Sequence, residues 1–191
     1  MILTLCTITC NELEALKRML EPLKGNVDDY VIGVDDKTTD GTFEWLSANG
    51  YKPYHFHFEN FSQVRNLGMA KVKTPWILIM DSDEMILPQH AVIMRDLCRQ
   101  GSKFKFDAYS FVRHHWFDLE RTKPWNLATP DIHPKLVRSH LRFEGKVHEQ
   151  MTNIRNCKFL ESFESHHFNN YYRDAKAWEE KNLFYKKLSE S

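Results

Sequence analysis

The sequence predicts an α/β protein with a mostly parallel central sheet, flanked by helices and followed by a C-terminal helix. Three observations support this fold class. Short β-branched, apolar runs alternate with amphipathic segments through the first half of the 191 residues. The connections between these segments are short, as in sheets whose parallel strands are joined by helices. Residues 171–188 are charged and amphipathic, which is typical of a surface helix.

The first half contains seven expected elements, alternating strand and helix: residues 2–8, 13–20, 30–34, 42–48, 54–58, 61–71 and 76–80. The strands are β-branched and apolar runs, and the helices carry apolar side chains at helical spacing. Asn11 could cap the first helix, which Pro22 and Gly25 end. The run at residues 76–80 is the most hydrophobic, so we expect a central strand covered on both faces.

The pattern is less regular in the second half, after Pro88. The expected elements there are a helix at residues 91–100, strands at 108–113 and 135–138, a Gly145-centred turn at 143–149 and a helix at 171–188. The last helix should pack four side chains inward: Ala175, Trp178, Leu183 and Phe184. No internal repeat or linker interrupts the chain, so we expect a single domain over residues 1–191.

The composition predicts a folded protein without net charge. The chain has 26 Lys and Arg against 26 Asp and Glu, which argues against a general polyanion binder. Four cysteines without a Cys-x-x-Cys pair suit neither a zinc site nor a disulfide framework. Residues 1–10 lack signal-peptide features, and no apolar run approaches the ~18 residues of a membrane span. We therefore expect a soluble, cytoplasmic protein.

Polar clusters follow three of the expected parallel strands, at residues 9–12, 35–37 and 81–84. Parallel strands end at the same edge of a sheet, where ligands of α/β proteins bind. The sequence therefore predicts a site at this edge.

Two carboxylates, Asp81 and Asp83, follow the most hydrophobic strand and are separated by Ser82. Both could reach one hard divalent cation such as Mg²⁺ or Mn²⁺, or its water shell. The plainer alternative is an acidic loop that caps the following helix.

Two further segments carry polar groups of interest. Asp36 could accept a hydrogen bond from a nucleobase imide or a ribose hydroxyl, and Arg65 offers a charged fork suited to phosphate. The alternatives are an Asp-rich turn and a surface arginine. Gly68 within the same helix as Arg65 predicts close packing of that helix backbone.

Together and in this order, these segments resemble the family 2 glycosyltransferases of the Rossmann-like GT-A fold. The matching stretches are residues 7–12, 34–42, 64–70 and 76–84, the last of which ends in the Asp-x-Asp signature. The second half is similar to small bacterial lipopolysaccharide-core glucosyltransferase-like proteins, on the stretches 130–131, 135–138, 143–149, 166–168 and 171–172. Lys135 departs from the arginine of that branch, and the doubled histidine leaves its register open.

The resemblance implies a metal-dependent, inverting hexosyltransferase that uses a nucleotide-sugar, expected to be a UDP-sugar. The implied nucleotide contacts are Thr7, Thr9, Glu12, Asp36, Arg65, Asp81 and Ser82. The implied ligands of Mn²⁺ or Mg²⁺ are Asp83, Asp81 and His167, with His166 as the fallback. Glu149 matches the catalytic base, and Asp131 is the second candidate. A polar junction at the two histidines, and a simple ion pair at Glu149, are the alternatives.

In this scheme residues 1–84 are the nucleotide-binding half and residues 85–191 the acceptor-binding half. The expected acceptor is a hydroxyl of a bacterial surface glycan. Modified DNA bases, as in phage-type enzymes, are an alternative, and the basic-aromatic residues 103–106 would suit nucleic acid. Four aromatic residues could stack on a sugar ring: Trp116, Phe117, Trp125 and Tyr171. The sequence predicts no oligomeric state.

Two functions of other classes compete with this prediction. A nucleotidyltransferase would need a Gly-rich basic loop after the first strand, which residues 7–12 lack. An inactive sugar-binding protein would not need Asp81, Asp83 and Glu149 together.

Overall fold

The structure is a computed structural model and describes residues 1–125, 131–172 and 175–190. Its strands are β1 (Leu3–Thr9), β2 (Asp29–Asp35), β3 (Tyr54–Phe56), β4 (Trp76–Ile79), β5 (Glu84–Ile86), β6 (Ala108–Trp116), β7 (Pro124–Trp125), β8 (Ile132–Arg138), β9 (Arg142–Glu144), β10 (Gln150–Thr152) and β11 (Cys157–His167). Its helices are α1 (Leu13–Leu20), α2 (Thr42–Ala48), α3 (Phe61–Lys71), α4 (Pro88–Ala91), α5 (Met94–Lys103), α6 (Asn169–Tyr172) and α7 (Ala175–Glu190), with a 3₁₀ turn at Glu21–Leu23.

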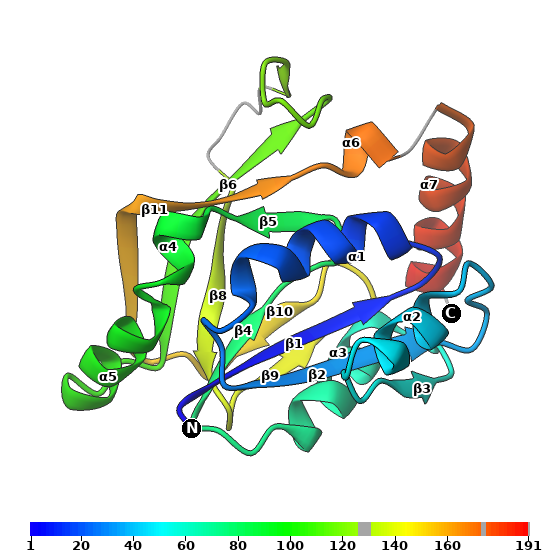
Figure 1. The fold of residues 1–191 in the computed structure, drawn as a ribbon. Coiled ribbons are helices and arrows are strands. Elements are labelled where there is room, and N and C mark those ends of the chain that lie inside the picture. Colours follow the sequence, from blue (N-terminus) through cyan, green and yellow to red (C-terminus); the bar gives the residue numbers. More distant parts are fainter. Residues whose placement is uncertain (126–130, 173–174, 191) are drawn as a thin grey trace.

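One large sheet forms the centre of the described chain, in the strand order β3-β2-β1-β4-β8-β6-β11-β5, and β7 pairs with β6 (Figure 1). Strands β3, β2, β1 and β4 run parallel, so their carboxyl ends lie at one edge. Strand β8 is antiparallel to β4 and β6, β11 is parallel to β6, and β5 is antiparallel to β11. The predicted fold class, a sheet flanked by helices with a helix at the C-terminal end, is confirmed.

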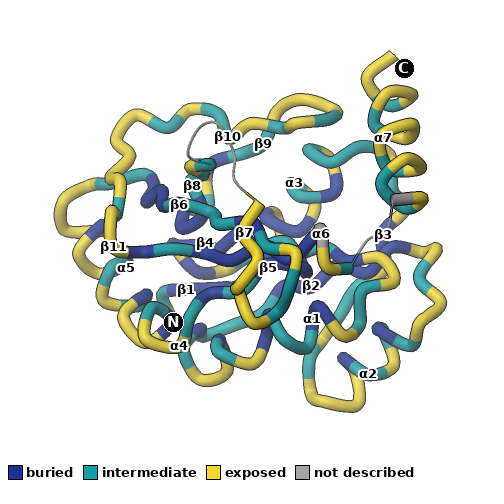
Figure 2. Tube along the Cα trace, turned by 90° about the horizontal axis from the view of Figure 1, so that it is seen from above, coloured by how far each residue is buried: buried dark blue, intermediate teal, exposed yellow. Residues whose placement is uncertain are grey.

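Strand β4 is central and covered on both faces, as its hydrophobicity predicts. Trp76 and Leu78 join one core cluster, together with side chains from α1, α2, α4 and α5. Ile77 and Ile79 join a second cluster, against α3 and the β9–β10 hairpin. Successive residues of a strand point to opposite faces, and both faces are covered, so all four residues are buried. Strand β4 is accordingly dark blue in Figure 2.

Gly68 lies where α3 crosses the sheet, and the predicted close packing is confirmed. A Cβ at this position would lie 2.8 Å from the Tyr54 hydroxyl oxygen and 3.0 Å from the Cys6 sulfur. No side chain larger than hydrogen fits there without displacing these neighbours.

The expectation that Asn11 caps α1 is wrong. Asn11 adopts a φ of 53° and its side chain accepts a hydrogen bond of 2.8 Å from the Thr39 amide. The exposed first amide of the helix, at Leu13, donates instead to the Asp40 carboxylate at 2.9 Å. The cap therefore comes from the loop after β2, and its hydrogen bonds connect that loop to the segment after β1.

The second half departs further from expectation. The helix expected at residues 91–100 is two helices, α4 and α5, and the strands expected at 108–113 and 135–138 extend to Trp116 and back to Ile132. Strand β11 was not expected, because its first six residues are mostly exposed and show no alternation of buried and exposed side chains. Pro130 lies outside the described residues.

Helix α7 forms, but the prediction of its buried face is wrong at Leu183 and Phe184. Leu183 and Phe184 are 54% and 43% exposed, and Trp178 is half-buried. The side chain of Ala175 lies outside the described part. The physical reason is that α7 lies along the edge of the molecule and contacts it through a narrow face (Figures 1 and 2).

Among the described residues, no helix combines the length and apolar character needed to cross a membrane. The four cysteines are free, with Cys6 and Cys98 buried and Cys10 and Cys157 exposed.

Candidate active site

The three polar clusters meet at the carboxyl edge of the parallel strands, as predicted. Glu12 follows β1, Asp36 follows β2, and the segment that begins at Asp81 follows β4. The Ser82 hydroxyl donates a hydrogen bond to the Glu12 carboxylate, which joins the first and third clusters. Ser82 is 3% exposed, so its end of this contact is buried.

Asp83 and His167 lie together at this edge, although they are far apart in the sequence. His167 is the last residue of β11, and its Nε2 lies 3.2 Å from Oδ1 of Asp83. The backbone amide of Phe168 donates to the Asp83 carbonyl at 2.9 Å and fixes the two segments. Both side chains are buried, so they do not form a partly exposed junction.

A chain of contacts joins His167 to Asp131 through His115. Asp131 Oδ2 lies 2.5 Å from His115 Nε2, and His115 Nδ1 lies 2.9 Å from His167 Nδ1. In one proton arrangement of this chain His115 donates to Asp131 and accepts from His167 Nδ1, which leaves a lone pair on His167 Nε2; in the other a doubly protonated His115 donates to both neighbours and His167 Nε2 carries the proton. In the first arrangement the Nε2 lone pair and Oδ1 of Asp83, 3.2 Å apart, could share one cation; in the second, Nε2 donates its proton to that carboxylate.

His166 points to the other face of the sheet. Its Nδ1 accepts a hydrogen bond of 3.0 Å from the Trp116 indole, and its Nε2 lies 3.4 Å from Glu164. Burial lowers the pKa of His166 to about 4. The structure therefore brings His167 to Asp83, and it does not bring His166 there.

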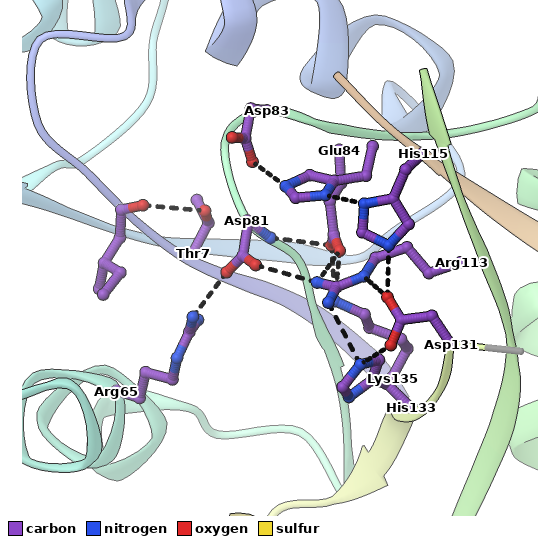
Figure 3. Close-up of polar contacts among 12 residues, drawn as sticks. Thr7, Arg65, Asp81, Asp83, Glu84, Arg113, His115, Asp131, His133 and Lys135 are labelled. Carbon is purple, nitrogen blue, oxygen red and sulfur yellow. Dashed lines mark hydrogen bonds and ion pairs between the residues drawn. The ribbon is translucent and has the colours of Figure 1, made fainter. Parts of the chain in front are cut away.

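Asp81 does not converge with Asp83. Its Oδ1 lies 2.6 Å from Arg65 Nη2 and its Oδ2 lies 3.6 Å from Arg113 Nη1 (Figure 3). Burial alone would raise the pKa of Asp81, but Arg65, Lys135 and Arg113 hold it well below its usual range. Within the described residues, no three His, Cys, Asp or Glu side chains are grouped as a preformed metal cluster.

Arg65 bridges the two halves of the chain. Its Nε lies 2.6 Å from Glu149 Oε1, and its Nη2 binds Asp81. Glu149 lies in the turn between β9 and β10 and its side chain is 12% exposed. The guanidinium expected to face phosphate is thus held between two carboxylates.

A buried network of charges supports this arrangement, and the sequence analysis missed it. The Glu84 carboxylate accepts hydrogen bonds from Lys135 Nζ at 2.6 and 2.7 Å and from Arg113 Nη1 at 3.0 Å. It also accepts from the Asp81 backbone amide at 3.1 Å, which orients that residue. Arg113 and His115 share one face of β6, and this pair of polar residues two apart on a strand was the available signal.

Asp131, the second candidate base, is surrounded by cationic and imidazole groups. Its carboxylate contacts Arg113 Nε at 2.7 Å, His115 Nε2 at 2.5 Å and His133 Nε2. Burial would raise the pKa of Asp131, but hydrogen bonds from both histidines and the charge of Arg113 hold it far below its usual range. A carboxylate stabilised to this degree is a weak proton acceptor.

The remaining predicted nucleotide contacts lie along the same edge. Thr7 and Thr9 are 1% and 4% exposed, and within the described residues the Thr9 hydroxyl has no hydrogen-bond partner. Asp36 is exposed, with His57 Nδ1 3.6 Å from its carboxylate.

A cavity of about 500 Å³ opens beside Glu12 and is bordered by Cys10, Asn11, Glu12, Leu13, Glu14, Ala15, Asp40 and Tyr172. This volume lies in the range of small-molecule sites. Its carboxylates suit hydroxyl and N–H donors of a ligand, and phosphates would be repelled there.

Comparisons with known proteins identify a family and a related fold. The family model described as "Glycosyl transferase family 2" matches residues 4–175. The structure of S. aureus TarS residues 1–349 is 12% identical and covers 87% of this chain and 60% of that chain, with a TM-score of 0.59. The same protein in complex with UDP-GlcNAc is 14% identical and covers 96% and 65%, with a TM-score of 0.57. At this identity the likeness shows the fold alone.

A TPR repeat-containing protein of Synechococcus elongatus is 33% identical over 104 residues. The match covers 54% of this chain and 26% of that protein. The chain thus spans about a quarter of this curated relative and less than two thirds of the TarS chains.

Proposed function

The chain belongs to glycosyl transferase family 2, because that family's model matches residues 4–175, and on this premise we propose that it transfers a sugar from a nucleotide-sugar to a hydroxyl acceptor. The donor in this proposal is a UDP-sugar and the transfer inverts the anomeric carbon. Residues 1–84 hold the donor and residues 85–191 hold the acceptor. The observation that carries the proposal is the pair of Asp83, in the segment after β4, and His167, at the end of β11, together with the contacts from Asp81 through Arg65 to Glu149.

The residues present fit a divalent cation at Asp83 and His167. A carboxylate oxygen and an imidazole nitrogen that lie 3.2 Å apart are two ligand atoms that one cation can share. Donor phosphates and water would complete the coordination, as is common for Mg²⁺ and Mn²⁺. The imidazole favours Mn²⁺ over Mg²⁺. When bound, the cation would offset the charge on the leaving diphosphate. Asp81 supports the site through its backbone and its arginine pairs.

Glu149 is the proposed base. Its carboxylate is 12% exposed and is oriented by Arg65, so it has a fixed direction from which to accept the proton of an acceptor hydroxyl. Attack by that hydroxyl on the anomeric carbon, opposite the leaving diphosphate, inverts the centre in a single displacement. Asp131 is the weaker candidate, because its three partners stabilise the ionised form.

The nucleoside is proposed to bind in the cavity beside Glu12. Carboxylates at its border, with Asp36 nearby at the same edge, can accept hydrogen bonds from ribose hydroxyls and base N–H groups. Thr7 and Thr9 lie in the last three residues of β1, and Ser82 lies in the segment between β4 and β5. The proposed acceptor is a hydroxyl of a bacterial surface glycan. A modified DNA base is the alternative acceptor.

A donor panel tests the proposal. The protein is incubated with UDP-, GDP- and CMP-sugars, with Mn²⁺ or Mg²⁺, and both thermal stability and released nucleotide are measured. We expect stabilisation by a UDP-sugar with Mn²⁺, of about 2.7 kcal/mol at a hundredfold excess over Kd, together with slow hydrolysis. Stabilisation without any release would indicate an inactive binding protein. Release of diphosphate from a nucleoside triphosphate with a sugar phosphate would indicate a nucleotidyltransferase.

Three matched pairs of variants test the site assignments. Asp83→Asn should abolish metal-dependent turnover, whereas Asp36→Asn should lower the affinity for the donor without removing turnover. His167→Ala should weaken Mn²⁺ binding, whereas His166→Ala should not change it. Glu149→Gln should keep donor binding and lose transfer, whereas Asp131→Asn should retain part of the transfer. Unchanged transfer by Glu149→Gln would remove it as the base.

A further inference from the structure

His115 lies between the candidate metal ligand His167 and the carboxylate of Asp131. His115 on β6 and His167 on β11 are direct neighbours in the register of the two strands, and their Nδ1 atoms lie 2.9 Å apart. Their rings meet edge to face, with centroids 4.8 Å apart and an angle of 76° between the planes. Both residues are buried, so each ring packs against the other inside the protein.

The second nitrogen of each ring is also in contact with a carboxylate. His167 Nε2 lies 3.2 Å from Oδ1 of Asp83, and His115 Nε2 lies 2.5 Å from Oδ2 of Asp131, a contact that Figure 3 shows as a dashed line. Turning the His167 ring over would put carbon atoms where its two nitrogens now lie and would lose both contacts. Both proton arrangements of the chain keep the same ring orientation, because that orientation depends only on where the nitrogens lie.

Asp131 is itself anchored by other side chains. Its Oδ2 lies 2.7 Å from Arg113 Nε, and its Oδ1 contacts His133 Nε2. Its backbone carbonyl also accepts a hydrogen bond of 2.8 Å from the Arg113 amide. Both carboxylate oxygens therefore contact groups of the protein itself, which suits a fixed anchor better than a group that accepts a proton from a substrate.

The histidines that precede these two residues lie on the other face of the sheet. His114 and His166 alternate with His115 and His167 along β6 and β11, so their side chains point away from the candidate site. On that face His114 Nε2 lies 3.0 Å from Glu164 Oε2, and the His114 and His166 rings stack with centroids 5.8 Å apart. His114 is therefore a matched control for His115.

We propose that His115 and Asp131 are positioning residues of the metal site. Asp131 anchors His115, and His115 orients His167 so that its Nε2 is presented to the cation shared with Asp83. This inference rests on the proposed function, and it gives Asp131 a role other than that of a proton acceptor. Residues that orient a metal-binding imidazole typically contribute about 10–100-fold to metal affinity.

The first test measures Mn²⁺ binding to the protein, with and without UDP, from the electron paramagnetic resonance signal of Mn²⁺ in solution. In His115→Phe the affinity for Mn²⁺ should fall about 10–100-fold, because the new ring has no nitrogen to contact His167. The same substitution at the preceding residue, His114→Phe, changes the other face of the sheet and should leave the affinity unchanged. An unchanged affinity in His115→Phe, or equal losses in the two variants, would overturn the inference.

A second readout distinguishes the orientation of His167 from general damage to the fold. An imidazole ligand favours Mn²⁺ over Mg²⁺, so His115→Phe should lower the affinity for Mn²⁺ more than that for Mg²⁺. Competition of Mg²⁺ against Mn²⁺ measures the ratio. The nitrogen coupling of bound Mn²⁺, measured by electron spin echo envelope modulation, should weaken in His115→Phe, as in His167→Ala. Equal losses for the two ions with full nitrogen coupling would show a purely structural role and overturn the inference.

A double-mutant cycle tests whether Asp131 acts through His115. Asp131→Asn alone should weaken Mn²⁺ binding less than His115→Phe does, since His115 still contacts His167. In the His115→Phe background, Asp131→Asn should cause no further loss, and additive losses would overturn the assigned role of Asp131. His115→Asn keeps a polar group near the position of Nδ1 and should retain more Mn²⁺ affinity than His115→Phe. If circular dichroism shows that His115→Phe does not fold, the cycle with His115→Asn decides in the same way.

The results also separate this inference from the proposed function. If the parent binds Mn²⁺ and loses it in Asp83→Asn, but not in His115→Phe or Asp131→Asn, the proposed metal site stands and the inference is overturned. If the parent binds no Mn²⁺, with or without UDP, the proposed metal site is overturned together with the inference.

Discussion

Replacing Glu84 by glutamine should destabilise the protein strongly. Its side chain is fully buried, and its two oxygens accept from Lys135 Nζ, Arg113 Nη1 and the Asp81 amide. Burial would raise the pKa of Glu84, but Lys135 and Arg113 lower it, so the group is an anion in the folded state. A glutamine amide is neutral, so the buried Lys135 ammonium would lose the carboxylate that it contacts through both oxygens.

The expected loss follows from the desolvation of the remaining lysine. Removing one partner of a buried ion pair costs about 3–5 kcal/mol. A domain of this size loses about 2–4 °C in Tm per kcal/mol, so the melting temperature should fall by roughly 6–20 °C. Urea unfolding followed by circular dichroism at pH 7 measures the free energy directly.

A double-mutant cycle isolates the pair. Lys135→Met should cost about 2–3 kcal/mol less in the Glu84→Gln background than in the parent, because the unpaired charge is then absent. Glu14→Gln breaks an exposed pair with Lys17 and serves as the control, with little expected change. A decrease in unfolding free energy below about 1 kcal/mol in Glu84→Gln would refute the reasoning, because the buried pair would then contribute no more than an exposed one.

Three further predictions concern pH, packing and catalysis. The pKa of Asp28 is lowered, because two backbone amides near the chain start and Arg95 outweigh its burial. Its stabilisation is therefore present above about pH 4 and is lost as the pH falls below that value. The stability difference between the parent and Asp28→Asn should shrink in urea titrations from pH 6 to pH 3, and a constant difference would contradict this. In Gly101→Ala, the new Cβ would lie 2.5 Å from the Trp76 ring, so the variant should lose about 1–3 kcal/mol in the same assay despite the better helix propensity of alanine. An unchanged urea midpoint of unfolding would show that the Trp76 indole can move aside. Arg65→Lys keeps the charge but loses the two-pronged geometry, so kcat should fall by roughly ten- to a hundredfold with little change in donor affinity. A loss confined to donor affinity would assign Arg65 to the phosphates instead.

The parts that the sequence predicts well are those set by local patterns. The helices expected at residues 42–48 and 61–71 have the observed bounds, and the parallel strands agree within two residues. Strand hydrophobicity placed β4 at the centre, and the parallel arrangement then brought Glu12, Asp36 and Asp81 to one edge. Each of these inferences needs only neighbouring residues and the geometry of parallel sheets.

The parts that the sequence does not predict depend on contacts between distant segments. Glu84 and Lys135 are 51 residues apart, and nothing local indicates that the two charges meet inside the protein. Strand β11 changes register between Phe159 and Glu164, which erases the alternation that would identify it. The apolar pattern of α7 favoured Leu183 as a buried residue, but only the position of the helix at the sheet edge decides which side is covered.

The bridge formed by Arg65 has a consequence for recombining members of this family. A chimera cut after residue 84 would inherit the guanidinium and Asp81 from one parent and the carboxylate of Glu149 from the other. Exchanging the acceptor half between relatives therefore replaces Glu149, one of the two carboxylates that pair with Arg65. Such hybrids should work only between parents that supply a matching acid at the tip of the β9–β10 hairpin, which makes that tip the first position to inspect when crossover libraries are planned.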